Sequence, residues 1–259
     1  MPQYTAMLYE VRDGVATITL NQPDAANSLN HELSTEMLDA IIRSEEDPAV
    51  RAMVITATGR FFCAGADLRS FYTAAGDLKN RVSFLHVALS RIVRSPFPVI
   101  GAINGTAAGG GMGLACACDL LVAAESAKFI MAYTRRGLSP DGTTTYFLPR
   151  RIGLGRALEL AYLNRTLSAR EAMEWGIVNQ VAPDDDLGTR AHAIAADLAK
   201  GPTRAFAVAK RLMHSGCVET LETQIENEIR SIYEMAGTED TREAIRAFNE
   251  KRTPVFKGR

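Results

Sequence analysis

INGTAAGGGMGLACACDLL, the stretch from Ile103 to Leu121, has four glycines within five residues and no Ser, His, Glu or Lys. The preceding FPVIGAI predicts a buried strand, and GMGLACAC predicts a helix, so the glycines lie where a strand gives way to a helix. Glycine lets the backbone approach a ligand closely. The first amides of a helix lack internal partners and lie at the positive end of its dipole. The stretch therefore suits an oxygen that is, or becomes, negative.

The spacing of these glycines excludes the common nucleotide-binding loops. GxGxxG does not occur in the stretch, and Gly105 with Gly110 fits GxxxxG without the Lys-Ser/Thr that a P-loop requires. No Gly-x-Ser-x-Gly nucleophile elbow occurs in the chain. Taken alone, the small residues are better explained by tight helix packing.

A second glycine loop, GRFFCAGADLRSF from Gly59 to Phe71, also follows a predicted strand and precedes a predicted helix. Two such loops can each direct one backbone N–H group toward the same oxygen. Strand and helix patterns alternate through the first part of the chain, which indicates an α/β layer structure. After about Gly153 the strand pattern vanishes and only helices are predicted. We therefore predict an α/β core over residues 1–200 and a helical C-terminal region over residues 201–259.

The composition of the 259 residues is that of an ordinary globular protein, with 47% hydrophobic and 23% charged residues and a net charge of −1. These totals show no electrostatic footprint for nucleic acid or for an anionic membrane. The N-terminus has no signal-peptide pattern and no apolar run could span a bilayer, so a cytoplasmic protein is expected. The four cysteines do not follow zinc spacings, which predicts free, buried thiols and no metal site.

FFCAGADL and INGTAAGGGMGLACACD together resemble the crotonase superfamily, the enoyl-CoA hydratase/isomerase family. The resemblance extends over essentially the whole chain, through SLN at 28–30, SPFPVIGAING at 95–105, LSAREAMEWGIVNQVAP at 167–183 and the ending AFNEKRTPVFKGR. It implies a spiral of repeated ββα units with a helical C-terminal region, assembled as a homotrimer or homohexamer. It also implies an acyl-CoA substrate, with coenzyme A entering as part of the thioester and no permanently bound cofactor.

The resemblance assigns roles to individual residues. Two backbone N–H groups, those of Ala64 and Gly110, would hold the thioester carbonyl and stabilise the enolate. The residues expected to contact coenzyme A are Ala64, Ala66, Asp67, Leu68, Phe248 and Lys251, the last two from a neighbouring subunit in many family members. For Lys251 an ordinary solvated helix charge explains the residue equally well.

The two glutamates with which hydratases of this family activate water are both missing. Their places are taken by Gly113 and Tyr133. Glycine transfers no proton, and an unperturbed tyrosine, with a pKa of roughly 10, is a poor acid or base near neutral pH. One carboxylate remains in the region: Asp141 follows Pro140, as in the isomerase branch of the family. Its alternative role is that of a helix N-cap, which would lower its pKa and make it a poorer base.

The leading hypothesis is an enoyl-CoA double-bond isomerase with Asp141 as its single proton shuttle. The alternatives are an enoyl-CoA hydratase or another enolate reaction of the family, and a non-catalytic acyl-CoA binder. His86, on a predicted helix beside the acyl pocket, is either a satisfied half-buried side chain or a pocket residue, as in a dehalogenase branch of the family. The role of Tyr133 stays open in the same way, between lining the acyl pocket and core packing.

Overall fold

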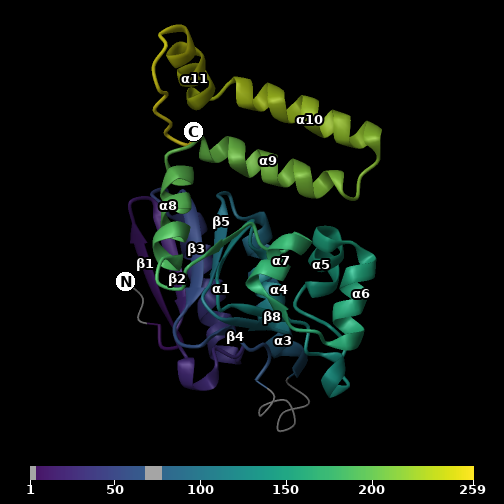
Figure 1. Cartoon of the computed structure of the whole chain (residues 1–259). Coiled ribbons are helices and arrows are strands. Elements are labelled where there is room, and N and C mark those ends of the chain that lie inside the picture. Colours follow the sequence, from purple (N-terminus) through teal and green to yellow (C-terminus); the bar gives the residue numbers. More distant parts are fainter. Residues whose placement is uncertain (1–3, 68–77) are drawn as a thin grey trace.

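The structure is a computed structural model that describes residues 4–67 and 78–259. It contains two sheets, and the strands of the larger one extend from the left side of the molecule into its interior (Figure 1). Its strand order is β1-β2-β3-β5-β7-β10. The hairpin of β1 and β2 is antiparallel, as the turn residues predict, and every later pairing is parallel. The strands are β1 Met7–Arg12, β2 Val15–Leu20, β3 Ala52–Ala57, β5 Val99–Ile103, β7 Leu120–Ala124 and β10 Gln180–Ala182.

The smaller sheet has the order β4-β6-β8-β9. Its strands are β4 Phe61–Cys63, β6 Thr106–Ala108, β8 Lys128–Ile130 and β9 Leu167–Ser168. Successive strands enter different sheets: β3, β5 and β7 join the larger one, and β4, β6 and β8 that follow them join the smaller. Helical segments then carry the chain back to the larger sheet. This confirms the predicted α/β spiral of ββα units.

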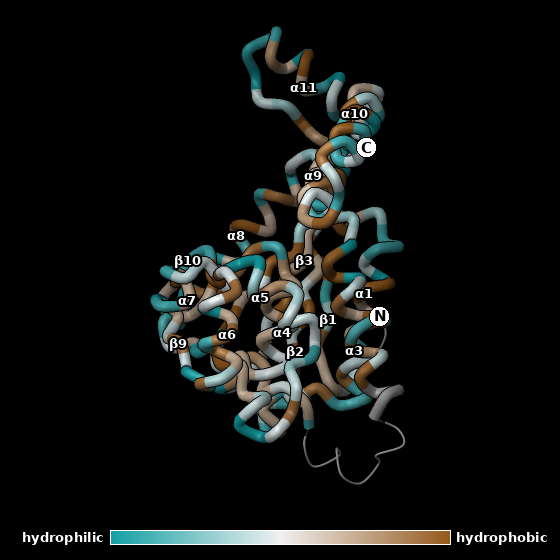
Figure 2. Tube along the Cα trace, turned by 90° about the vertical axis from the view of Figure 1, so that its right-hand side faces the viewer, coloured by the Kyte–Doolittle hydropathy of each residue, from teal (hydrophilic) through white to brown (hydrophobic). Residues whose placement is uncertain are grey.

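The helices of the spiral surround the sheets, and Figure 2 shows α1 and α8 on opposite sides of the large-sheet strands. Helix α1 begins after Asn30, whose side chain caps it by accepting a hydrogen bond of 2.8 Å from the Leu33 amide. These helices are α1 His31–Glu46, α3 Leu78–Arg94, α4 Gly110–Ala117, α5 Thr144–Ile152, α6 Leu154–Leu163, α7 Ala169–Trp175 and α8 Leu187–Ala199, with 3-10 turns at Pro23–Ala25 and Thr134–Arg136.

Three C-terminal helices, α9 Thr203–Gly216, α10 Leu221–Ala236 and α11 Glu239–Asn249, form an arm in which α9 lies against the spiral and α10 and α11 extend away from it (Figures 1 and 2). Lys210 of α9 ties the arm to the core. Its nearly buried ammonium donates to the Asp119 carboxylate at 2.8 Å and to the Ile92 carbonyl at 2.9 Å. A buried charge requires such partners, so Asp119 has a structural role.

The sequence analysis missed the strands beyond Gly153. β10 adds to the larger sheet beside β7, and β9 pairs antiparallel with β8. Both are three residues or shorter, too short to show a strand pattern, and they exist because the spiral offers them open sheet edges.

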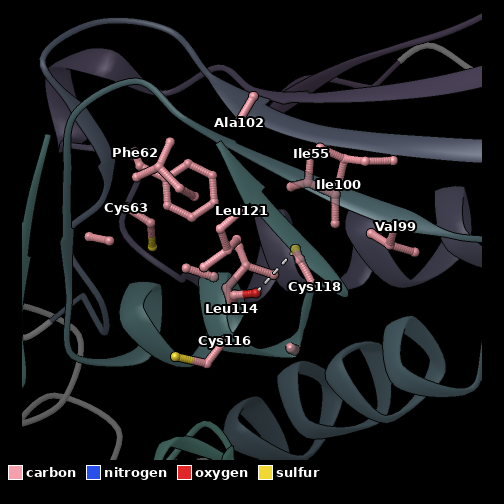
Figure 3. Packing of buried hydrophobic residues seen from close by; sticks show 14 of the residues in the cluster. Ile55, Phe62, Cys63, Val99, Ile100, Ala102, Leu114, Cys116, Cys118 and Leu121 are labelled. Atoms are coloured by element: carbon pink, nitrogen blue, oxygen red, sulfur yellow. Dashed lines mark hydrogen bonds between the residues drawn. The ribbon is translucent and has the colours of Figure 1, made fainter. Parts of the chain in front are cut away.

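The core explains why the glycine stretch is so bare. Figure 3 shows α4 packed under the strands, with Leu114 and Cys118 near Leu121. A side chain on Gly111 would place its first carbon well under 3.0 Å from the Cys63 carbonyl oxygen, so only glycine fits there.

The cysteine prediction was right for three thiols and wrong for one. All four are free; Cys63, Cys116 and Cys118 are buried, but Cys217 is exposed at the end of α9. Among the described helices, none has the length and apolarity needed to cross a membrane.

Candidate active site

A cavity of about 500 Å³ opens where the two glycine loops and the segment after β8 meet. Residues 64–67, which follow β4 and are called the first loop from here on, line one side, and Gly109 and Gly110, which follow β6 and are called the second loop, line another. The segment between Ala132 and Asp141 closes the third side. The spiral thus brings together three segments that lie about 40 and 30 residues apart in the sequence, a separation consistent with its repeated ββα turns.

Gly110 places an unpaired amide in this cavity. It is the first residue of α4, and the N-cap, Gly109, has no side chain to accept from the helix amides. Among the described residues, no carbonyl accepts from the Gly110 amide, which lies at the positive end of the helix. The position of a Cβ on Gly65 would be 3.1 Å from this amide nitrogen, so the two loops are in contact.

The hydrogen bonds of the first loop contradict the role predicted for Ala64. Its amide donates to the Ala26 carbonyl at 3.1 Å and is therefore not free for a ligand. Two residues later, Ala66 forms an isolated parallel bridge with Leu29, in which the Leu29 amide donates to the Gly65 carbonyl at 2.8 Å. In this pairing the N–H group of Ala66 itself faces away from Leu29. No described backbone carbonyl accepts from it, so the Ala66 amide is an available donor among residues 64–67 at the cavity.

Asp141 lines the cavity and is half-buried. The alternative role as a helix cap is wrong, because the N-cap of α5 is Thr143, which has a left-handed backbone and makes no side-chain cap. The local hydrogen bonds use the main-chain carbonyl of Asp141, which accepts from the Thr144 amide at 3.1 Å and from the Thr144 hydroxyl at 2.7 Å. The carboxylate is therefore not consumed by the helix start.

Tyr133 is a buried neighbour of this carboxylate. Its ring lies against Gly109, and its hydroxyl donates to the Asp141 carbonyl at 3.1 Å. Burial, and then the charge of Asp141, raises the pKa of Tyr133 well above its usual value. The phenol therefore stays protonated and acts as a hydrogen-bond donor. The residue before it, Ala132, has a φ of 59°, an uncommon conformation for a residue with a side chain.

The turn that carries Asp141 packs directly against Gly113. A Cβ on Gly113 would lie well under 3.0 Å from the Gly142 carbonyl oxygen, and at 3.0 Å from the Thr144 hydroxyl. The turn that carries Asp141 thus occupies the volume that any side chain at position 113 would need. A backbone carbonyl cannot move aside as a flexible side chain can, so an acid at position 113 and this turn exclude one another.

The other predicted residues fall into three groups. Asp67 and Ala66 line the cavity, whereas Leu68 lies outside the described residues. Phe248 and Lys251 lie at the end of α11, in the arm that stands away from the cavity, and a role for them would require a second copy of the chain (Figure 1).

His86 has a partner that the sequence could not reveal. It is half-buried on α3, and its Nε2 accepts a hydrogen bond of 3.1 Å from the Gly142 amide, next to Asp141. Among the described residues that line the cavity, Tyr133 is the only aromatic one.

The spiral fold places two amides without a described carbonyl partner, and a carboxylate, around one cavity. Such a site belongs to the class of proteins that can hold a developing oxyanion and move a proton next to it. Comparison with known proteins gives the class a name. The family model for enoyl-CoA hydratase/isomerase matches residues 10–259. A 1,2-epoxyphenylacetyl-CoA isomerase of Escherichia coli is 40% identical over 259 aligned positions, covering 98% of both chains.

Two further relatives carry other names. A 4-chlorobenzoyl coenzyme A dehalogenase of an Arthrobacter species is 36% identical, over 93% of this chain and 90% of its own. The solved structure of an enoyl-CoA hydratase from Bacillus anthracis superposes with a TM-score of 0.94 at 36% identity, over 98% of this chain and 100% of its own. The chain belongs to the enoyl-CoA hydratase/isomerase family, within the crotonase superfamily.

Proposed function

We propose that the chain is an enoyl-CoA double-bond isomerase in which the Asp141 carboxylate carries one proton between two carbons of the acyl group. The observation that carries this proposal is the exclusion of a side chain at position 113 by the Gly142 carbonyl. With that place closed and Tyr133 held neutral, we assign the base to Asp141, whose turn packs against Gly110. Asp67, the other described carboxylate at the cavity, lies in the loop assigned to coenzyme A. Membership of the enoyl-CoA hydratase/isomerase family supports a thioester substrate.

The proposed reaction begins with a 3-enoyl-CoA whose thioester oxygen accepts from the amides of Gly110 and Ala66. The Asp141 carboxylate removes a proton from C2, and the electron pair spreads over C2, C4 and the thioester oxygen as a dienolate. The two amides stabilise the charge on that oxygen. The protonated Asp141 returns the proton to C4, which leaves the double bond between C2 and C3. One base suffices, and no water is consumed.

The test is Asp141→Asn, with 3-hexenoyl-CoA as substrate and the absorbance of the conjugated 2-enoyl thioester as the readout. Loss of a positioned acid–base group is expected to lower kcat by roughly 10²–10⁴-fold. The KM should change little, because the thioester contacts remain. Glu125→Gln is the matched control, since Glu125 is paired with Arg170 at 2.8 Å on the surface. Turnover by the Asn variant at the wild-type rate would refute the role of Asp141.

Hydration is the competing reaction within the family. Crotonyl-CoA loses its conjugated absorbance when water adds to it, so the same spectrometer tests the alternative. We expect the wild-type protein to isomerise 3-hexenoyl-CoA at least tenfold faster than it hydrates crotonyl-CoA. Faster hydration would replace the isomerase by a hydratase. Binding of both thioesters without turnover of either would favour an acyl-CoA binder.

We further propose that copies of the chain associate through the arm and that a neighbouring copy supplies Phe248 and Lys251 to the coenzyme A moiety. The support is an exposed set of large apolar side chains on the arm, which includes Ile229, Ile232 and Phe248. Such a set is unusual for a monomer. Light scattering should give the mass of a trimer or hexamer of the 28.1 kDa chain. A monomer would refute the association.

A further inference from the structure

The turn that carries Asp141 is strained and has open space on both sides. Gly142 and Thr143 have φ values of 56° and 62°, and the left-handed conformation is uncommon for threonine. Asp141 lines the 500 Å³ cavity, while Thr143 lines a second cavity of about 820 Å³ between α3, α5 and α9. A thin, strained wall between two cavities keeps one conformation only if other segments hold it.

The peptide group between Asp141 and Gly142 is held from both of its edges. On one edge, its carbonyl accepts from the Tyr133 hydroxyl at 3.1 Å and the Thr144 hydroxyl at 2.7 Å. On the other edge, its N–H group donates to His86 Nε2 at 3.1 Å. Tyr133 and Thr144 are near in sequence, whereas His86 comes from α3, 56 residues earlier. Among the described hydrogen-bond partners of this peptide, His86 is the one that comes from a helix distant in the sequence.

This hydrogen bond fixes the state of the imidazole. Nε2 can accept from an N–H group only when it carries no hydrogen, so the ring that makes this bond has its hydrogen on Nδ1. A ring nitrogen committed to the Gly142 amide is not available to the acyl group. His86 is also not among the described residues that line the 500 Å³ cavity. Its geometry is that of a support for Asp141.

We propose that His86 is a positioning residue: by accepting from the Gly142 amide it sets the direction of the Asp141 carboxylate. The inference rests on the proposed role of Asp141. The turn that His86 holds also packs against the residue that supplies the amide donor, because a Cβ on Gly142 would be 3.4 Å from the Gly110 Cα. A turn released from His86 moves the base relative to the amide donor. Misplacement of about 1 Å can lower a rate by roughly 10²-fold without removing a binding contact.

The test compares three variants at this position. In His86→Gln the amide oxygen reaches about the place of Nε2 and can accept from Gly142. In His86→Asn the side chain is one carbon shorter and reaches only the place of Nδ1, and His86→Leu has no acceptor. With 3-hexenoyl-CoA, we expect the Asn and Leu variants to lose roughly 10–100-fold in kcat with KM within about threefold of wild type. The Gln variant should retain kcat within about fivefold.

A second readout separates this inference from the isomerase proposal. Exchange of the C2 protons of the acyl-CoA with D₂O, followed by mass spectrometry, reports enolate formation whatever product follows. If the wild type exchanges the C2 protons without isomerising the substrate, the isomerase proposal fails. The exchange rates of the three variants then still test the role of His86. If the wild type does neither, both proposals fail together.

Thermal unfolding of each variant shows whether a loss of activity comes from loss of the folded structure. Should the Leu variant unfold, the Gln and Asn variants, which differ by one methylene group, remain the matched pair. A Gln variant as impaired as the Asn variant would overturn the inference, because the acceptor would then not be what matters. Wild-type kcat and exchange in the Asn variant would overturn it as well.

Discussion

The amide half of the site and its acid half are built differently. The Gly110 amide is held by regular structure, since the start of α4 follows directly from β6 in the buried core. The Asp141 carboxylate lies on a half-exposed turn held by side chains, among them those of Tyr133 and His86. One half is fixed by the backbone of the spiral, and the other by a few replaceable hydrogen bonds.

This difference shows how one fold can serve several reactions. Relatives named as an isomerase, a dehalogenase and a hydratase align with nearly the whole chain. Exchange of a few side chains in an acid half can change the proton chemistry while an amide half is kept. Such side-chain exchanges are coupled, because an acid at position 113 would overlap the Gly142 carbonyl and so exclude the turn that carries Asp141.

The strongest way to break the comparison is Gly113→Ala, where the two halves touch. The added methyl group would overlap the Gly142 carbonyl, so the turn or α4 must shift. We expect isomerisation of 3-hexenoyl-CoA to fall by more than about 100-fold. Overpacking should lower the free energy of unfolding by about 1–3 kcal/mol, measured by denaturant titration.

The control for that variant is Gly155→Ala, in α6, where an added Cβ meets nothing within 4 Å. A glycine replaced by alanine in an open helical position gains up to about 1 kcal/mol, so stability should stay or rise and activity should be unchanged. Full activity in Gly113→Ala would show that the acid turn tolerates displacement, against the argument for Asp141.

The sequence predicted the architecture well because its patterns are long. The strand predicted in FPVIGAI and the helix predicted in GMGLACAC match β5 and α4, since the patterns that predict them are local. The strands β9 and β10 were missed because two or three residues carry no pattern of their own. Their conformation comes from sheet edges contributed by β8 and β7.

The site was harder to predict because it depends on contacts between distant segments. Whether Ala64 or Ala66 has the free amide is decided by Ala26 and Leu29, in a loop that pairs with them from almost 40 residues earlier. His86 looked like an ordinary half-buried histidine, since only the fold places Gly142 against it. The loss of the acid at position 113 was visible in the sequence, but not the turn that fills its space.

A smaller effect is expected from Tyr133→Phe, which sharpens the description of the acid half. The Asp141 carbonyl keeps its bonds from the Thr144 amide and hydroxyl, so the turn loses one of three donors. We expect kcat to fall about 5–10-fold and the free energy of unfolding to fall by about 1 kcal/mol. A loss beyond 100-fold in kcat, at unchanged stability, would instead make the phenol a participant in proton transfer.

The last prediction expects no change in activity. It tests whether the loop that follows Cys63, in the amide half, stays packed and keeps this thiol buried. Cys63 ends β4, directly before residues 64–67, and burial raises the pKa of its thiol to about 12. Because the thiolate is the reactive form, Cys63 should resist iodoacetamide at pH 8 while the exposed Cys217 is modified, as peptide mass mapping would reveal. Cys217→Ser should abolish the rapid labelling and keep full turnover. Rapid labelling of Cys63 in the native protein would mean that the amide loop opens, and the contrast between a rigid and an adjustable half would no longer hold.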